Sequence, residues 1–316
     1  MSHTHKVVIC GAGFIGSYIA RAFAAATPGV HIVLASRNPG KLETNLSKSV
    51  DATVSASSMD VTNIASVRSV MKDARTVISL VGILHGSVKR FEAVQWKGAE
   101  NVATAAQEVG AKVIHFSAIG ADPSSPLVSP RTKGLGEQAV LNVSPAATII
   151  RPSLVFGPGD SFFSRFATLS RFLPFMPVFG GGASRFQPIY VGDLARLVEL
   201  CSHTERSEVK RLVEGKILEA GGPDVFTYKE IMQLVLKYTG RWRPIISAPF
   251  WVGNIQGAIF EQLPENILSI SRDQISQLKL DNIVADKGQE KLVTELLQMQ
   301  GDGPRKSVHD VLPSYL

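Results

Sequence analysis

The sequence is poor in the residues that build disulfide frameworks and metal centres. Cys10 and Cys201 are the only cysteines among 316 residues. A pair so far apart, without a secretory signal, argues against a disulfide framework and indicates a reducing compartment. The seven histidines, His115 among them, show no metal-ligand spacing, so we expect no metal site. A P-loop and a G-x-S-x-G elbow are also missing, which argues against P-loop nucleotidases and serine hydrolases.

Long hydrophobic runs and blocks of one charge are scarce as well. Two long uncharged runs, 7–20 and 244–260, hold a glycine-rich turn in one case and prolines, Asn254 and Gln256 in the other. Neither run predicts a membrane span. The net charge of +6 is mild and no Lys/Arg block carries interleaved aromatics, so we expect no nucleic-acid partner. Phosphates, an anionic membrane face or an acidic partner would still be attracted.

What the sequence does have, close to its start, is glycine in a phosphate-binding pattern. An apolar strand at 6–10 leads into Gly11, Gly13 and Gly16, and an apolar-periodic helix follows from Phe14 to about Ala26. In such a motif the first glycine permits a tight turn, the second lets a pyrophosphate approach the backbone, and the third lets helix and strand pack closely. The helix start, with Phe14 and Ile15, offers free N–H groups to phosphates. The alternative is a glycine turn without a ligand.

Strand and helix patterns alternate through the first half, which predicts βαβ units and a parallel sheet. We expect an α/β fold, a Rossmann-type doubly wound sheet with a small discontinuous C-terminal lobe. Residues 1–155 with 188–220 would form the nucleotide domain, and 156–187 with 221–316 the lobe for a substrate or partner. The expected strands are 31–35, 52–55, 76–82, 112–117, 147–152 and 217–220; the expected helices include 60–71, 88–108, 132–141, one from Asp193, which caps it, and one opened by the capping box Thr227–Glu230.

The end of the second expected strand bears on the choice of cofactor. Where an NAD site would place an acidic residue for the ribose hydroxyls, this chain has Ser36 and Arg37. An arginine there pairs with a 2′-phosphate, so NADP(H) is favoured over NAD(H). The alternative is that Arg37 is a solvated loop charge. Gly82, at the carboxyl end of the fourth strand, lies where ligands bind in open parallel sheets.

Taken together, these residues resemble the extended short-chain dehydrogenase/reductases. The resemblance is carried by the glycine turn, Asp60-Val61, Val81-Gly82, Ser117, Lys133, Arg151-Pro152, Val155, Gly157-Pro158 and 187–193. Gly180–Gly182 before Phe186, and Ser271–Gln274 with Asp281-Asn282, resemble an atypical branch. That branch holds the nucleotide-binding accessory subunit of respiratory complex I and a fungal mitochondrial protein of ubiquinone biosynthesis. Motif and resemblance together imply cofactor contacts from Gly11, Gly13, Phe14, Ile15, Gly16, Ser36, Arg37, Asp60, Val61, Leu80, Val81, Gly82, Ser117, Lys133, Pro152 and Val155.

The chain departs from this family at its catalytic position. Family enzymes use Tyr-x-x-x-Lys, and here Ser129 stands where the tyrosine belongs while Lys133 is kept. A serine hydroxyl is too weak an acid to replace the phenol unaided. Lys133 would still bind the nicotinamide ribose, and Ser117 occupies the place of the family's catalytic serine or caps a turn. Cys10 replaces the family's first glycine, and we interpret it as a packing residue.

The resemblance implies a mitochondrial protein on the matrix side of the inner membrane. The preferred interpretation is an NADP(H)-binding accessory or regulatory member of the ubiquinone-biosynthesis assembly, with residual reductase activity as an option. A complex I accessory subunit with a structural nucleotide is the alternative in the binding class, and an active reductase or epimerase the alternative among enzymes. Because the first strand starts at Lys6, we expect any import signal to be uncleaved or internal.

A helical stripe in the C-terminal third completes the expectations. Trp251 and Ile255 recur at helical spacing with Ala258, Ile259 and Gln262, which is typical of a core-facing helix. The alternative is that this helix and the stretch 162–179 contact a membrane surface or shelter a prenylated quinone intermediate. Nearby cations that would suit anionic headgroups are Arg165, Arg171, Arg241 and Arg243.

Overall fold

A seven-stranded sheet, in which every neighbouring pair of strands is parallel, forms the centre of the larger of two units. The computed structural model describes residues 5–260, 271–299, 301 and 303–316. The larger unit comprises Met1–Pro152, Val191–Ala220 and Asp286–Pro304, and the smaller unit Ser153–Tyr190, Gly221–Ala285 and Arg305–Leu316. The expected doubly wound α/β fold is confirmed.

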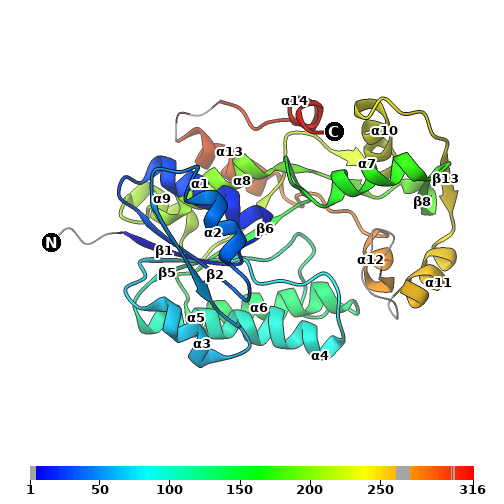
Figure 1. Ribbon diagram of the computed structural model, residues 1–316. Helices are drawn as coiled ribbons and strands as arrows, with labels where there is room; N and C mark the ends of the chain where they lie inside the picture. The colour runs from blue at the N-terminus through cyan, green and yellow to red at the C-terminus, as the bar shows by residue number, and fades with distance from the viewer. Residues whose placement is uncertain (1–4, 261–270, 300, 302) are drawn as a thin grey trace. The chain divides into compact units, whose positions relative to one another are not determined.

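The elements of the larger unit alternate along the chain (Figure 1). They are β1 (Lys6–Cys10), α1 (Phe14–Ala26), β2 (His31–Ser36), α2 (Gly40–Leu46), β3 (Thr53–Ser58), α3 (Ile64–Met71), β4 (Thr76–Ser79), α4 (Val88–Phe91), a π-helical segment (Glu92–Gly98), α5 (Ala99–Glu108), β5 (Lys112–Phe116), α6 (Val128–Val143), β6 (Thr148–Pro152), α8 (Val191–Ser202), α9 (Ser207–Val213), β11 (Ile217–Ala220) and α13 (Lys287–Gln298).

The strand order β11-β6-β5-β4-β1-β2-β3 reverses direction between β1 and β4. Val8 of β1 pairs with Val33 of β2 on one side and with Val77 of β4 on the other. Helices α1 and α8 cover one face of the sheet and α3, α5 and α6 the other (Figure 1). Strands covered on both faces must be apolar throughout, which explains the unbroken run in β1. The reversal opens a crevice at the carboxyl ends of β1 and β4, where ligands bind in this class of fold.

Three helices differ from the expected ones in where they begin or in whether they are continuous. The helix expected from Asp60 begins at Ile64, where Asn63 accepts hydrogen bonds from the N–H groups of Ala65 and Ser66. The helix expected over 88–108 is interrupted by the π-helical segment. Helix α8 begins at Val191, so Asp193 is not its cap but lies in its first turn and pairs with Arg196 at 2.5 Å.

Helix α13 belongs to the larger unit, although the sequence grouped residues 221–316 in the small lobe. It contacts β11 and α8, and Val293, Leu296 and Leu297 are buried. This return of the chain brings together segments far apart in sequence, which local patterns do not reveal.

The smaller unit has its own core, built from Phe156, Phe163, Met176, Ile231 and Val235. Thr227 and Glu230 form the expected capping box at the start of α10. Its elements are β7 (Val155–Phe156), α7 (Phe162–Phe172), β8 (Met176–Phe179), a 3₁₀ turn (Gly180–Gly182), β9 (Arg185–Phe186), β10 (Ile189–Tyr190), β12 (Phe226–Thr227), α10 (Tyr228–Tyr238), β13 (Ile245–Ala248), α11 (Phe250–Phe260), α12 (Arg272–Gln277), α14 (Val308–Val311) and a second 3₁₀ turn (Leu312–Ser314).

The core interpretation of the 251–262 stripe is wrong for the two positions that test it. Trp251 is 64% exposed and Ile255 is 55% exposed on α11. Gln262 lies outside the described residues, as do the side chains of Ala258 and Ile259. Within the described part of the chain, no helix combines the length and apolar character needed to cross a membrane.

Candidate nucleotide-binding site

In the turn between β1 and α1, two of the three glycine positions have no room for a side chain. Gly11 has φ +133°, a conformation that side chains rarely adopt, and its N–H donates to the Ala35 carbonyl at 2.9 Å. A Cβ at Gly11 would lie 2.8 Å from the Cβ of Leu80, and a Cβ at Gly16 would lie 2.3 Å from the Gly11 carbonyl oxygen. The turn and the start of α1 are therefore packed too closely for any side chain at these positions.

Gly13 is different, because no neighbour among the described residues requires it to be glycine. None of their heavy atoms lies within 4 Å of where its Cβ would be. The backbone hydrogen bonds of α1 begin with the Ser17 N–H, which donates to the Gly13 carbonyl at 3.0 Å, and no side chain caps the helix. The N–H groups of Phe14, Ile15 and Gly16 precede this bond. Open space above uncapped N–H groups at a helix start fits a pyrophosphate.

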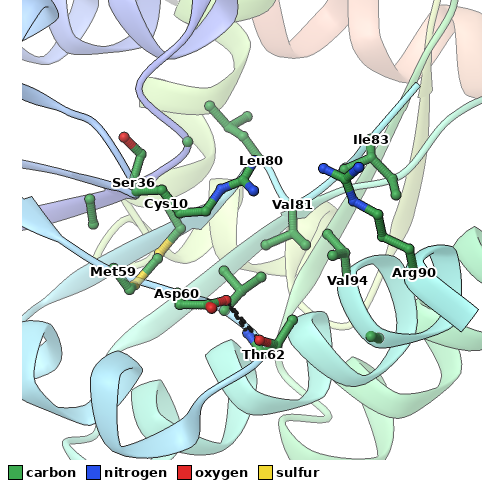
Figure 2. Close-up of a pocket in the computed structure, with 16 residues that line it drawn as sticks. Cys10, Ser36, Met59, Asp60, Thr62, Leu80, Val81, Ile83, Arg90 and Val94 are labelled. Atoms are coloured by element: carbon green, nitrogen blue, oxygen red, sulfur yellow. Dashed lines mark hydrogen bonds between the residues drawn. The ribbon is translucent and has the colours of Figure 1, made fainter. Parts of the chain in front are cut away.

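A cleft of about 290 Å³ continues from this turn along the carboxyl ends of β1, β2 and β4. In Figure 2, Ser36 and Arg90 lie at opposite sides of the cleft, with Leu80 and Val81 between them. Eight of the predicted cofactor contacts line it, namely Gly11, Ser36, Arg37, Asp60, Val61, Leu80, Val81 and Gly82. Apolar walls with a few polar groups are typical of sites for the adenosine part of a dinucleotide.

Two arginines give this cleft its positive character. Arg37 follows directly on β2, where no acidic residue competes for the ribose. Arg90 comes from α4, just before the π-helical segment that contributes Ala93 and Val94 to the lining. The sequence analysis missed Arg90, because an arginine inside a helical pattern ordinarily predicts a solvated face. Both guanidinium-bearing side chains line the cleft, so each is placed to attract an anionic group there.

Asp60 lines the cleft and is held in place by Thr62, two residues further along the chain. Its Oδ1 accepts hydrogen bonds from the Thr62 N–H at 2.9 Å and from the Thr62 Oγ1 at 2.8 Å (Figure 2). These bonds, helped by the positive charge of Arg37, lower the pKa of Asp60. Thr62 was not predicted, although an aspartate two residues before a threonine is a known turn pattern.

The far end of the predicted site is built around the amine of Lys133. Its Nζ donates to the carbonyl oxygens of Val81 and Phe116, each at 2.9 Å, and so joins the ends of β4 and β5. Burial lowers its pKa to about 8, against a smaller opposing effect of Glu137. A neutral amine still donates two hydrogen bonds, which is the number made here.

Ser117 adds an unused polar group at the end of β5. Its N–H donates to the Ile150 carbonyl at 2.8 Å, but its buried Oγ has no hydrogen-bond partner among the described residues. A buried hydroxyl without a partner is costly, so a bound ligand is a natural partner for it. His115, one residue earlier, bonds to Ser79 Oγ through Nδ1 at 3.1 Å, and burial lowers its pKa to about 3.

Ser129 lies in the first turn of α6, one helical turn before Lys133. The family's phenol is missing from this turn of the helix, and the only tyrosine of the larger unit is Tyr18 on α1. The four others belong to the smaller unit. Acid–base chemistry of the family's kind therefore lacks its proton donor in the larger unit.

The remaining predicted residues occupy other places. Lys133 and Ser117 lie outside the cleft lining, Pro152 ends β6, and Val155 is in the smaller unit on β7. Cys10 lines the cleft, and burial raises the pKa of its thiol to about 12, so the thiol stays protonated at neutral pH. Among the described residues, no group of three His, Cys, Asp or Glu side chains is placed to hold a metal ion.

Comparison of the sequence with known proteins shows which families and relatives this chain is similar to. The sequence profile of the NAD dependent epimerase/dehydratase family matches residues 7–213. The subunit 9 of the NADH dehydrogenase [ubiquinone] 1 alpha subcomplex, mitochondrial, from Arabidopsis thaliana is 32% identical over 231 residues, covering 70% of this chain and 56% of the relative. A ceramide reductase from Caulobacter vibrioides is 32% identical over 180 residues, covering 56% of this chain and 54% of the relative. The chain thus spans about half the length of these curated relatives.

Among solved structures, the dTDP-glucose 4,6-dehydratase of Bacillus anthracis in complex with NAD superposes with a TM-score of 0.69. It is 12% identical and covers 98% of this chain and 95% of that chain, which shows the fold. The expected resemblance to the atypical branch is confirmed by the relatives. Those from plants, fungi and rodents are mitochondrial by name, which supports the mitochondrial location expected from the resemblance.

Proposed function

Because this chain belongs to the NAD dependent epimerase/dehydratase family, we propose that it binds NADP(H) and acts as a nucleotide-carrying accessory subunit of the mitochondrial ubiquinone-biosynthesis assembly. The observation that supports nucleotide binding in an accessory role is a contrast within the predicted site, while the ubiquinone assignment rests on the resemblance to the atypical branch. The glycine turn and the arginine-bearing cleft are present, whereas Ser129 occupies the place of the family's proton donor.

The choice of NADP(H) rests on Arg37 and Arg90. A 2′-phosphate adds two negative charges to the adenosine end, and a guanidinium pairs with such a group in two parallel hydrogen bonds. The carboxylate that would select the ribose hydroxyls of NAD(H) is missing from the end of β2. Phosphate oxygens would accept from the N–H groups at the start of α1.

The proposal of an accessory role rests on proton transfer. NADPH, when bound, supplies a hydride from its nicotinamide ring, and the product oxyanion then needs a proton. Ser129 is a poor proton donor, since the pKa of an aliphatic hydroxyl group lies far above the working pH. Lys133 would bind a ribose hydroxyl in exchange for one of its two carbonyl partners, and Ser117 Oγ would gain the partner it lacks.

Two observations favour competing candidates. The relatives named as subunits of NADH dehydrogenase support a place in respiratory complex I, with the nucleotide as a structural element. The relative named ceramide reductase supports a turnover enzyme that uses another proton donor. Both candidates keep the same nucleotide site.

Sedimentation of tagged protein from detergent-solubilised mitochondria separates the first two assignments. We expect co-sedimentation with the ubiquinone-biosynthesis proteins and not with complex I, and a shift to the free protein in an Arg37→Ala variant. Migration with complex I would contradict the preferred assignment. Steady NADPH oxidation with a quinone or long-chain ketone would contradict the accessory role, above all if it survived Ser129→Ala and was lost with Lys133→Met.

A further inference from the structure

The smaller unit exposes apolar side chains out of proportion to its size. Eleven large hydrophobic side chains of the described residues are exposed, and eight of them belong to the smaller unit. Trp242 is 83% exposed and Phe172 is 78% exposed. Exposed apolar side chains that gather in one patch mark a site of interaction with a protein or a membrane. The eight are Phe172, Phe175, Val225, Trp242, Ile246, Trp251, Ile255 and Leu280.

Backbone pairing brings two of the aromatic members, Phe172 and Trp242, together. Strands β8 and β13 run parallel, with Ile245 opposite Met176, so the segments that lead into them lie side by side. The Arg243 Nε donates to the Leu173 carbonyl at 2.9 Å, and the Met176 N–H donates to the Pro244 carbonyl at 2.9 Å. Phe172 and Trp242 are each next in sequence to one of these bonded residues. Helix α11, with Trp251 and Ile255, follows β13 directly (Figure 1).

The charge on these segments is of one sign. Residues 161–184 and 231–260 contain five Lys or Arg and no Asp or Glu. Around Trp242 the cations converge on a groove of about 480 Å³, lined by Lys229, Lys237, Arg241 and Arg243. None of the described residues that line this groove is acidic.

We propose that the surface formed by Phe172, Trp242 and the cationic groove, with Trp251 on α11 beyond the other end of β13, docks the protein onto an anionic phospholipid membrane. Tryptophan and phenylalanine bind at the boundary between headgroups and acyl chains, and each nearby lysine or arginine adds attraction to the negative surface. The contact is peripheral, in keeping with the lack of a spanning helix in the described part of the chain. A protein partner would need a matching acidic and apolar face, whereas a bilayer offers phosphates and acyl chains to any such surface.

Flotation of the full chain with vesicles tests the proposal. With vesicles of equal parts phosphatidylcholine and phosphatidylglycerol we expect the protein to float. With phosphatidylcholine alone, or at high salt, most of it should stay in the dense fraction. Trp242 and Trp251 are two of the three tryptophans, so emission should shift to the blue and become sensitive to brominated acyl chains.

Paired variants give the test its controls. Lys229→Glu with Lys237→Glu should weaken binding to the anionic vesicles by about tenfold or more, and Trp242→Ser with Trp251→Ser should abolish the blue shift. Lys48→Glu and Leu84→Ser change an exposed cation and an exposed leucine of the larger unit, and they should float like the unmodified protein. All variants must keep the unmodified melting temperature.

Three results would overturn the proposal. The unmodified protein could stay in the dense fraction with anionic vesicles, which would assign the surface to a protein partner. It could bind neutral and anionic vesicles alike, or the control variants could lose as much binding as the paired ones. An Arg37→Ala protein should float normally, so failure of the nucleotide proposal and failure of this one are distinguishable.

Discussion

The two ends of the nucleotide site differ in how much of their chemistry is available to a ligand. At the phosphate and adenosine end, Gly13 leaves open space, the start of α1 is uncapped and Arg37 reaches a cleft of about 290 Å³. At the other end the amine of Lys133 is engaged by two carbonyl oxygens and Ser129 replaces a phenol. Binding depends on backbone shape and one or two cations, whereas turnover depends on a single acid. A family member can therefore lose turnover and still bind the nucleotide.

The largest effect on stability is expected from replacing Gly16, which packs against protein backbone and has no room for a side chain. A methyl group in Gly16→Ala would come 2.3 Å from the Gly11 carbonyl oxygen, which is backbone and gives way little. We expect a loss of about 3 kcal/mol in the free energy of unfolding, measured by urea denaturation.

Gly13→Ala is the matched control for Gly16→Ala. Its methyl group meets no protein atom within 4 Å, so stability should stay within about 0.5 kcal/mol while nucleotide affinity falls. Equal stability losses in the two variants, or normal nucleotide binding by Gly13→Ala, would contradict the division of roles among these glycines.

The second effect concerns the buried amine at the other end. Burial lowers the pKa of Lys133 to about 8 from an ordinary value near 10.5. Between these values the unfolded chain binds the proton more tightly than the native protein does, so native stability contributed by this group rises with pH. The rise should reach roughly 3 kcal/mol and be missing in Lys133→Met. Unfolding free energies of both proteins from pH 7 to 10.5 measure it, and parallel curves would show that Lys133 is solvated.

Local sequence predicted the glycine turn between β1 and α1, because its strand, glycines and helix are neighbours in the chain, and the same stretch of sequence leads on to Arg37, which lines the cleft. It missed Arg90, which lies on α4, and Val94, which lies on the π-helical segment that follows and whose spacing departs from the 3.6-residue period. It placed the start of α3 at Asp60, whereas the helix begins at Ile64. The Asp60 carboxylate accepts hydrogen bonds from Thr62 in a turn before the helix, and the sequence pattern does not reveal that turn. The exposure of Trp251 also escaped it, since an apolar stripe looks the same whether it covers a core or awaits a partner.

The most direct test of the central claim is a binding titration with NADPH and NADH side by side, on the unmodified protein and on Arg37→Ala. Arg211→Ala is the control, since Arg211 is exposed on α9 and does not line the cleft. We expect NADPH to bind more tightly than NADH, and Arg37→Ala to weaken NADPH by roughly 10- to 100-fold while leaving NADH unchanged, because a charge-assisted contact to the 2′-phosphate is lost. Equal affinities for the two nucleotides, or no binding of either, would contradict the claim.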